Sequence, residues 1–235
     1  MPNITYIDGK YLNYEDSKIH VNDRGYHFGD AVYEVIVFNK NIFYDFDDHI
    51  QRLFKSLKSL EIKFSLSSSS LRIIIKNLIR LNKAIIGSVY IQVSRGVAER
   101  NHSFHGLNIK PILTIILTKK SSIQNDLNGV KAITLNDNRW SRPDIKTTQL
   151  LPNVLAKTLA NKNNAYESIF IDDEGYVTEG SSSNIWVLNK ENQLITRNLD
   201  GKILSGITRN SISLFAKKKK ITIIEKKINQ IEPVS

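Results

Sequence analysis

The stretch VTEGSSSN, residues 177–184, places an acidic residue beside a glycine and follows it with three consecutive hydroxyl side chains. Apolar, strand-like runs flank this stretch on both sides, so Glu179 is expected to point toward the interior of the protein. A buried carboxylate without a partner is costly, because it loses its hydration and gains nothing in return. The sequence therefore predicts a cationic group beside Glu179.

The stretch LSGITRNSI, residues 204–212, begins a predicted helix directly after a strand. Backbone N–H groups, the helix dipole and a hydroxyl would meet there at Gly206, Ile207 and Thr208. Such a helix start can bind a phosphate. An ordinary capped helix start is the alternative interpretation.

Cationic side chains lie where a predicted strand runs into a loop, in SVYIQVSRGVAERNHSF. Arg95, Arg100 and His102 could hold a carboxylate there, since an arginine fork binds both oxygens of a carboxylate at once. A solvated surface loop is the alternative.

Lys146 lies between a loop that contains Pro143 and a predicted helix. A lysine amine whose pKa is lowered by its surroundings can act as a nucleophile. In a chain with 33 Lys and Arg residues, an ordinary surface lysine is the alternative. Taken together, an amine, a buried carboxylate and a phosphate-binding helix start suit pyridoxal phosphate, whose aldehyde, pyridine nitrogen and phosphate need these three groups.

Mixed helices and strands must position these residues. A hairpin is predicted around Asp8-Gly9, because this dipeptide forms turns between apolar runs. Two strands joined by a turn at 39–41 are predicted within 31–46, and single strands are predicted at 87–96, 110–118 and 130–135. A hairpin is predicted over 166–180 with its turn at 172–175, and two more strands follow it.

Helical spacing of apolar residues predicts helices within 47–62, at 71–82 and at 205–216. Asp47 or Asp48 is the predicted cap of the first helix, and a serine-rich loop caps the second. One more helix is predicted from the apolar residues Leu150, Leu151, Val154, Leu155 and Leu159. The fold class is therefore α/β, with helices and strands mixed along the chain (α+β).

The polar stretch 119–129 is the predicted linker between two domains. A small N-terminal α/β domain is expected over 1–118 and a large cofactor-binding domain over 130–235. At 235 residues and 41% hydrophobic content, the chain can bury a substantial core.

Composition excludes several classes of protein. The chain has no cysteine, which rules out disulfides, thiolate metal sites and cysteine nucleophiles, and we expect no metal site. The net charge of +10 comes from scattered lysines and one run at 217–220, which suits a helix C-terminus better than a nucleic-acid surface. Charges also interrupt the most apolar window, 71–93, and no secretory signal is visible. We therefore expect neither a nucleic-acid nor a membrane partner, and a cytoplasmic location.

Six stretches occur in the order in which they are found in one enzyme family, from about Ile19 to Arg209. They are NDRGYHFGDAVYEVI, DDHIQRL, SRGVAERNHSF, RWSRPDIKTTQLLPNVLAK, VTEGSSSNIW and ILSGITR. On these motifs the chain resembles the fold-type IV pyridoxal phosphate enzymes, which comprise D-amino-acid transaminases, branched-chain aminotransferases and aminodeoxychorismate lyases. The resemblance implies a two-domain fold and pyridoxal 5′-phosphate as cofactor.

The resemblance also implies roles for individual residues. Lys146 would be the Schiff-base lysine, and Glu179 would partner the pyridine nitrogen. The phosphate would be held by Arg52 together with Gly206, Ile207 and Thr208. Ser181, Ser182 and Ser183 would line the cofactor, and Leu204 would pack against its ring. The substrate α-carboxylate would be trapped by Tyr33, Arg100 and His102, the last two reaching over from the partner subunit of a homodimer.

The arginine-x-histidine pair favours the D-amino-acid transaminases, since branched-chain enzymes and the lyases typically lack it. The implied reaction is ping-pong and moves an amino group between a D-amino acid, such as D-alanine or D-glutamate, and a 2-oxo acid. Val37 stands where many relatives carry a basic residue, which leaves the preferred side chain open. The chain also ends sooner than its relatives, so a catalytically impaired or non-enzymatic family member is the alternative of another class.

Overall fold

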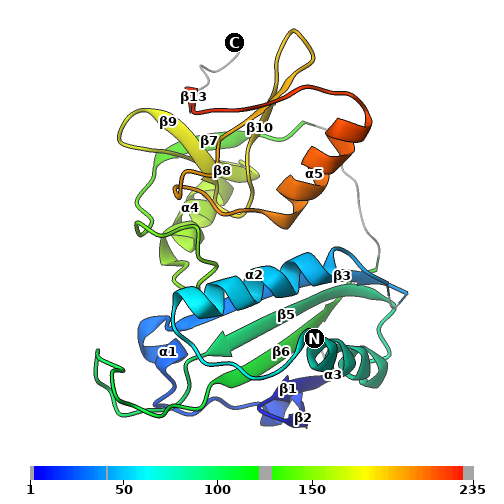
Figure 1. Ribbon diagram of the computed structural model, residues 1–235, viewed down its shortest axis with the longest axis vertical. Coiled ribbons are helices and arrows are strands. Elements are labelled where there is room, and N and C mark those ends of the chain that lie inside the picture. Colours follow the sequence, from blue (N-terminus) through cyan, green and yellow to red (C-terminus); the bar gives the residue numbers. More distant parts are fainter. Residues whose placement is uncertain (1–2, 41, 122–128, 230–235) are drawn as a thin grey trace. The chain divides into compact units, whose positions relative to one another are not determined.

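A computed structural model describes residues 3–40, 42–121 and 129–229 of the chain (Figure 1). The chain forms two compact units. The first comprises Met1–Asn125 with Ile145–Gln149, and the second comprises Asp126–Asp144 with Leu150–Ser235. The segment that carries Lys146 thus belongs to the first unit, although it follows the predicted linker. Most of that linker, 122–128, lies outside the described residues.

The first unit contains an antiparallel sheet with the strand order β2-β1-β6-β5-β3-β4. Its strands are β1 (Ile4–Ile7), β2 (Lys10–Asn13), β3 (Ala31–Asn39), β4 (Ile42–Phe43), β5 (Ile86–Ser94) and β6 (Ile112–Lys119). Alternate residues of a strand face opposite sides of a sheet. In β5 the buried positions are Val89, Ile91 and Val93, so one face of the sheet is apolar and lies against the core.

Two amphipathic helices, α2 (Phe46–Ser59) and α3 (Ser68–Leu81), pack against this sheet (Figure 1). Their apolar stripes are buried, as the periodicity predicts, with Leu53 and Leu71 both fully covered. The predicted cap of α2 is wrong: the helix begins at Phe46, so Asp47 and Asp48 lie in its first turn. There they suit the positive end of the helix dipole. Two shorter elements, η1 (Tyr14–Asp16) and α1 (Arg24–Phe28), lie between β2 and β3.

The second unit contains two small sheets. One has the order β13-β9-β8-β7 and the other the order β10-β11-β12. These strands are β7 (Ala132–Asn136), β8 (Glu167–Ile171), β9 (Tyr176–Gly180), β10 (Trp186–Leu188), β11 (Leu194–Thr196), β12 (Ile223–Glu225) and β13 (Ile228–Asn229). The predicted turn between β8 and β9 is confirmed, with Gly175 in the left-handed region at a φ of 84°.

Two helices complete this unit, α4 (Leu151–Lys162) and α5 (Ile207–Lys218). Helix α4 packs against β8 and β7 through small residues, since Ala156 and Ala160 are its buried positions. The large apolar residues that predict this helix lie on its exposed side: Leu151, Val154, Leu155 and Leu159. Within the described residues, every helix is too short or too polar to cross a membrane.

Candidate active site

The segment that carries Lys146 is joined to the beginning of β3. The backbone N–H of Tyr33 donates to the carbonyl of Lys146 over 3.0 Å, and the N–H of Thr148 donates to the carbonyl of Ala31 over 3.1 Å. These bonds place the Lys146 Nζ 4.2 Å from the centre of the Tyr33 ring, a favourable cation–π contact. The structure therefore brings together a predicted catalytic residue and a predicted substrate-binding residue.

A second tyrosine lies behind the first. The rings of Tyr33 and Tyr90 are stacked with centroids 5.5 Å apart, and the Tyr90 hydroxyl donates to Gln92 over 2.7 Å. Burial, together with the neighbouring Tyr33 hydroxyl, raises the pKa of Tyr90 to about 12. Tyr90 is therefore a neutral phenol near neutral pH.

Arg52, on α2, forms a bidentate ion pair with Glu34 of β3. The distances are 2.7 Å from Nε to Oε1 and 2.8 Å from Nη2 to Oε2, and His49 lies 2.7 Å from the same carboxylate. Burial acts to raise the pKa of the fully buried Glu34, but hydrogen bonds from Arg52 and His49 outweigh it and lower this pKa below its ordinary value. The predicted phosphate ligand is thus held in a fixed orientation by a carboxylate.

Sequence reasoning missed Glu34, although the alternation of β3 contains the signal. Val32, Glu34 and Ile36 occupy successive positions on one buried face of the strand. A carboxylate in such an apolar row needs a cation within the fold.

The predicted carboxylate-binding cations divide into two groups. Arg95 is buried and forms a bidentate pair with Asp30, at 2.7 and 3.0 Å, so its predicted role beside Arg100 and His102 is wrong. Arg100 and His102 are exposed, and both lie against Phe28: the Arg100 Cζ is 5.3 Å from the ring centre, and the His102 ring is 5.4 Å away.

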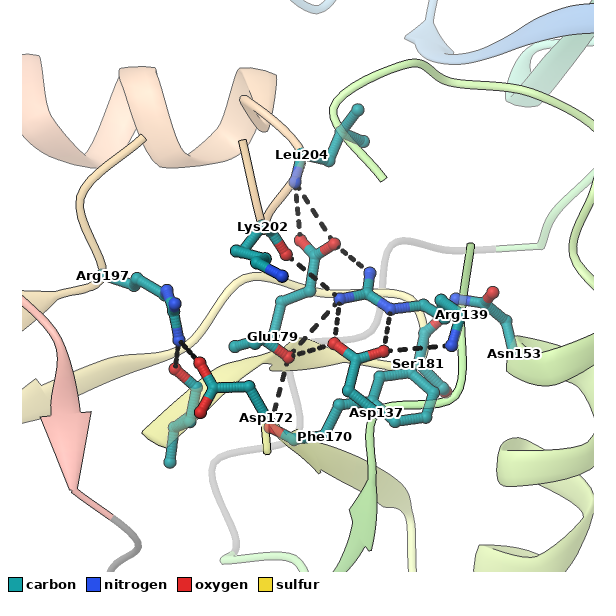
Figure 2. Close-up of polar contacts among 12 residues, drawn as sticks. Asp137, Arg139, Asn153, Phe170, Asp172, Glu179, Ser181, Arg197, Lys202 and Leu204 are labelled. Atoms are coloured by element: carbon teal, nitrogen blue, oxygen red, sulfur yellow. Dashed lines mark hydrogen bonds and ion pairs between the residues drawn. The ribbon is translucent and has the colours of Figure 1, made fainter. Parts of the chain in front are cut away.

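Glu179, on β9, is 6% exposed and accepts hydrogen bonds from donors of three kinds. The guanidinium of Arg139 donates to Oε1, and the backbone N–H of Leu204 lies 3.1 and 3.2 Å from the two oxygens (Figure 2). The side-chain amide of Asn184 donates to Oε2 over 2.9 Å. Burial raises the pKa of Glu179, and Arg139 acts against that rise. The protein's own cation beside Glu179 is therefore Arg139.

Asp137 fixes the orientation of Arg139. Its carboxylate accepts from the Nε and Nη2 atoms of Arg139 over 2.9 and 2.7 Å (Figure 2). It also accepts from the Thr178 hydroxyl over 2.7 Å. Burial opposes ionisation of Asp137, but these hydrogen bonds lower its pKa below the ordinary value. Arg139 was not predicted from the sequence, although it is the first residue of the RWSRPDIK motif. Its acidic partner Glu179 is 40 residues away, and residue spacing does not show such a pair.

The hydroxyls of the three serines predicted to line the cofactor converge on one carboxylate of the chain. Ser181 donates to Oε1 of Glu167, and Ser182 and Ser183 each donate to Oε2 over 3.1 Å. Burial acts to raise the pKa of Glu167, but hydrogen bonds outweigh it and lower this pKa below its ordinary value. The hydrogen bond from Ser181 makes the largest contribution to this lowering of the pKa. The hydroxyl groups thus order the turn that follows Glu179.

Helix α5 begins at Ile207, directly after Gly206, which has no side chain with which to cap the first turn. A Cβ atom at Gly206 would lie 2.0 Å from Oδ1 of Asn184, so only glycine lets Asn184 approach this turn. The Nε atom of Arg209, in the same turn, is buried and has no hydrogen-bond partner among the described residues. Gly206, Ile207 and Thr208 thus lie at the start of a helix, and the binding of a phosphate there stays a prediction.

The family match and the similar known proteins both indicate an aminotransferase. The chain matches the amino-transferase class IV family over residues 31–232. It is 38% identical to a D-alanine aminotransferase of Bacillus licheniformis over 229 residues, which cover 96% of this chain and 79% of that protein.

Its fold is similar to that of the Escherichia coli branched-chain amino acid aminotransferase, with a TM-score of 0.88, 22% identity, and coverage of 98% of this chain and 79% of that chain. It is also similar to a T.th. branched-chain amino acid aminotransferase determined with pyridoxamine 5′-phosphate, with a TM-score of 0.87, 20% identity, and coverage of 98% and 78%. At these identities the structural similarity concerns the fold alone.

Proposed function

The chain belongs to the amino-transferase class IV family, and we propose that it moves an amino group between a D-amino acid, such as D-alanine, and a 2-oxo acid. The observation that carries this proposal is the greater sequence identity to a D-alanine aminotransferase than to branched-chain enzymes of the same fold. The exposed pair Arg100 and His102 supports it, because a guanidinium and a nearby imidazole N–H can both donate hydrogen bonds to an α-carboxylate.

Enzymes of this family depend on pyridoxal phosphate, and the chain is accordingly a pyridoxal phosphate-dependent transferase. When bound, the cofactor supplies an electron-withdrawing ring that stabilises the charge left on the substrate Cα after loss of its proton. The described residues fit this group: Lys146 would bind its aldehyde, Glu179 its ring nitrogen, and Arg52 and the start of α5 its phosphate.

Lys146 and Glu179 would each act on one proton. The Nζ of Lys146 would take the proton from the substrate Cα, as a general base held over the Tyr33 ring. Glu179 would hold the proton on the ring nitrogen, and its three donors keep its oxygens in place for this task. Oε1 of Glu179 accepts from the charged guanidinium of Arg139, whereas the donors to Oε2 among the described residues are the neutral side-chain amide of Asn184 and the backbone N–H of Leu204. Oε2 is therefore the oxygen with the weaker donors.

Tyr33, Arg100 and His102 would bind the substrate carboxylate. Fixing the carboxylate decides which face of Cα presents its proton to Lys146, and so decides the chirality of the substrate. Arg100 and His102 are exposed in the single chain, which agrees with a position where they reach a partner subunit.

We further propose a homodimer. Four large apolar side chains form one stripe on α4 with exposed fractions between 41% and 68%: Leu151, Val154, Leu155 and Leu159. A contiguous apolar surface of this kind is unfavourable in water and marks a site of association. A second copy of the chain is the partner that the shared carboxylate site requires.

The test of this function is the visible absorption spectrum of the purified protein with pyridoxal phosphate, recorded before and after addition of D-alanine. We expect a band from the lysine-bound cofactor that D-alanine removes and L-leucine leaves unchanged. The Lys146→Ala variant should lack this band, whereas Lys76→Ala, which changes an exposed lysine on α3, should retain it.

Two other results would contradict the proposal. A band that responds only to L-leucine would assign the chain to the branched-chain aminotransferases. The absence of any band would favour a catalytically impaired family member.

A further inference from the structure

Arg24, the first residue of α1, lies against the loop that carries Arg100 and His102, and we propose that it is a positioning residue for the capture of the substrate carboxylate. The inference rests on the proposed function, because it concerns the same two side chains. It assigns a role to a residue that would itself touch neither substrate nor cofactor.

Arg24 holds the loop through its backbone. Its Nη1 donates to the carbonyl of Asn101, and its Nη2 donates to the carbonyl of His102 over 3.1 Å. Arg24 is only 3% exposed, so these bonds are shielded from water and carry the strength of charged donors. They fix two successive peptide groups directly after Arg100, while the side chains of Arg100 and His102 stay exposed.

The guanidinium of Arg24 is itself held in one orientation. Its Nε donates to Oδ2 of Asp30 over 2.9 Å, and Arg95 donates to both oxygens of the same carboxylate. The backbone N–H of Arg24 donates to the carbonyl of Gly96 over 2.9 Å, which ties α1 to the start of the loop. Arg24 therefore connects a buried charge cluster with both ends of the segment 96–102.

Phe28 extends this support from the backbone to the side chains. The Cζ of Arg24 is 4.7 Å from the centre of the Phe28 ring, and the Cζ of Arg100 is 5.3 Å from it. The ring of His102 contacts the same aromatic side chain. Arg24 and Phe28 are neighbours on one turn of α1, so the residue that fixes the loop also contacts the ring against which the side chains of Arg100 and His102 lie.

Only arginine can supply these contacts together. Its planar fork reaches Asp30, Asn101 and His102 in three directions, whereas a lysine ammonium is a point charge that cannot span them. Loss of the fork should let the loop move by an ångström or so, and a shift of that size at a positioning group weakens catalysis markedly.

We would compare Arg24→Ala and Arg24→Lys with the wild type and with Arg72→Ala, which removes a partly exposed arginine paired to Asp47 in the same unit. For Arg24→Ala we expect KM for D-alanine to rise about tenfold or more with a smaller change in kcat. The preference for D- over L-alanine should fall, since the carboxylate is no longer fixed on one side. Arg72→Ala should behave as the wild type.

Two further readouts separate positioning from a general loss of structure. Guanidinium ion added at millimolar concentration should partly restore the KM of Arg24→Ala, by occupying the space that the side chain leaves. Hydrogen exchange of the loop 96–105 should be faster in Arg24→Ala and intermediate in Arg24→Lys, with the sheet amides unchanged.

The outcomes distinguish this inference from the proposed function. A wild-type protein that does not transaminate D-alanine would overturn both. An active wild type whose Arg24 variants keep the same KM, the same chiral preference and the same loop exchange would overturn the inference alone. Uniformly faster exchange throughout the first unit, without rescue by guanidinium, would also overturn it, because it would show that Arg24 serves stability only.

Discussion

At the scale of single residues, Glu179 shows how this chain stabilises a carboxylate inside a protein. Its neighbours are a guanidinium, an amide and a backbone N–H, and the guanidinium is fixed in turn by Asp137. The arrangement places one cation, Arg139, between the buried Glu179 and the partly buried Asp137. Removing the cation leaves both acids uncompensated, which is more damaging than removing either acid.

We therefore expect Arg139→Met to lower the free energy of unfolding by about 3 kcal/mol. Denaturation by urea at neutral pH measures the loss. Arg142→Met is the matched control, since it lies in the same segment but pairs with Asp144 at the surface, where a salt bridge contributes little. Equal stabilities of the two variants would contradict the importance of the buried cluster.

Glu34 gives a prediction about pH. Because its pKa is lowered in the folded protein, its contribution to stability is complete above the ordinary value of 4.5 and is lost as the pH falls through the folded-state pKa. Glu34→Gln should cost about 2 kcal/mol near neutral pH, through the loss of charged hydrogen bonds to Arg52. The difference from wild type should shrink below pH 4.5. A difference that is constant across this range would show that the Glu34 charge is not involved.

At the scale of elements, the start of α5 depends on a close approach of two loops. Asn184 connects them, because its amide donates both to Glu179 and to the carbonyl of Leu204, and its oxygen lies where a side chain at position 206 would begin. The helix start and the carboxylate are therefore parts of one arrangement in the second unit.

Replacing Gly206 with alanine should displace Asn184 and weaken the binding of pyridoxal phosphate by about tenfold, since two of its proposed contacts shift together. Absorbance titration with the cofactor measures this affinity. Gly129→Ala is the control, because a Cβ atom there meets no atom within 4 Å. Unchanged affinity in Gly206→Ala would show that the start of α5 does not take part in cofactor binding.

At the scale of the whole molecule, the predicted residues Lys146 and Glu179 belong to different units, Lys146 to the first and Glu179 to the second. The proposed homodimer can be tested at the stripe on α4. This stripe consists of large apolar side chains that the chain itself leaves uncovered.

Leu155→Glu should convert the dimer to a monomer and abolish turnover of D-alanine while the circular dichroism of the helices is retained, because a charge in an apolar contact is not compensated. Light scattering after size-exclusion chromatography measures the mass. Ile73→Glu changes a side chain on α3 that is exposed to a similar degree, 61% against 58%, and should leave the mass unchanged. A Leu155→Glu protein that remains a dimer would place the interface elsewhere.

Local pattern in the sequence was sufficient for the elements whose burial follows their periodicity. The stripes of α2 and α3 and the turn before Gly175 depend on neighbours a few residues apart, and all three are present in the structure. The family motifs likewise predict roles for Lys146 and Glu179 from their local context, without any knowledge of what surrounds them.

Only the tertiary structure decided which partners these residues have. Arg139 and Glu179 are 40 residues apart, and Arg24 and Asn101 are 77 apart. Spacing cannot pair charges over such distances in a chain with 33 basic and 23 acidic residues. The same holds for α4: periodicity predicts a helix with an apolar face, but packing against β8 buries its alanines instead, because small residues allow the closer approach.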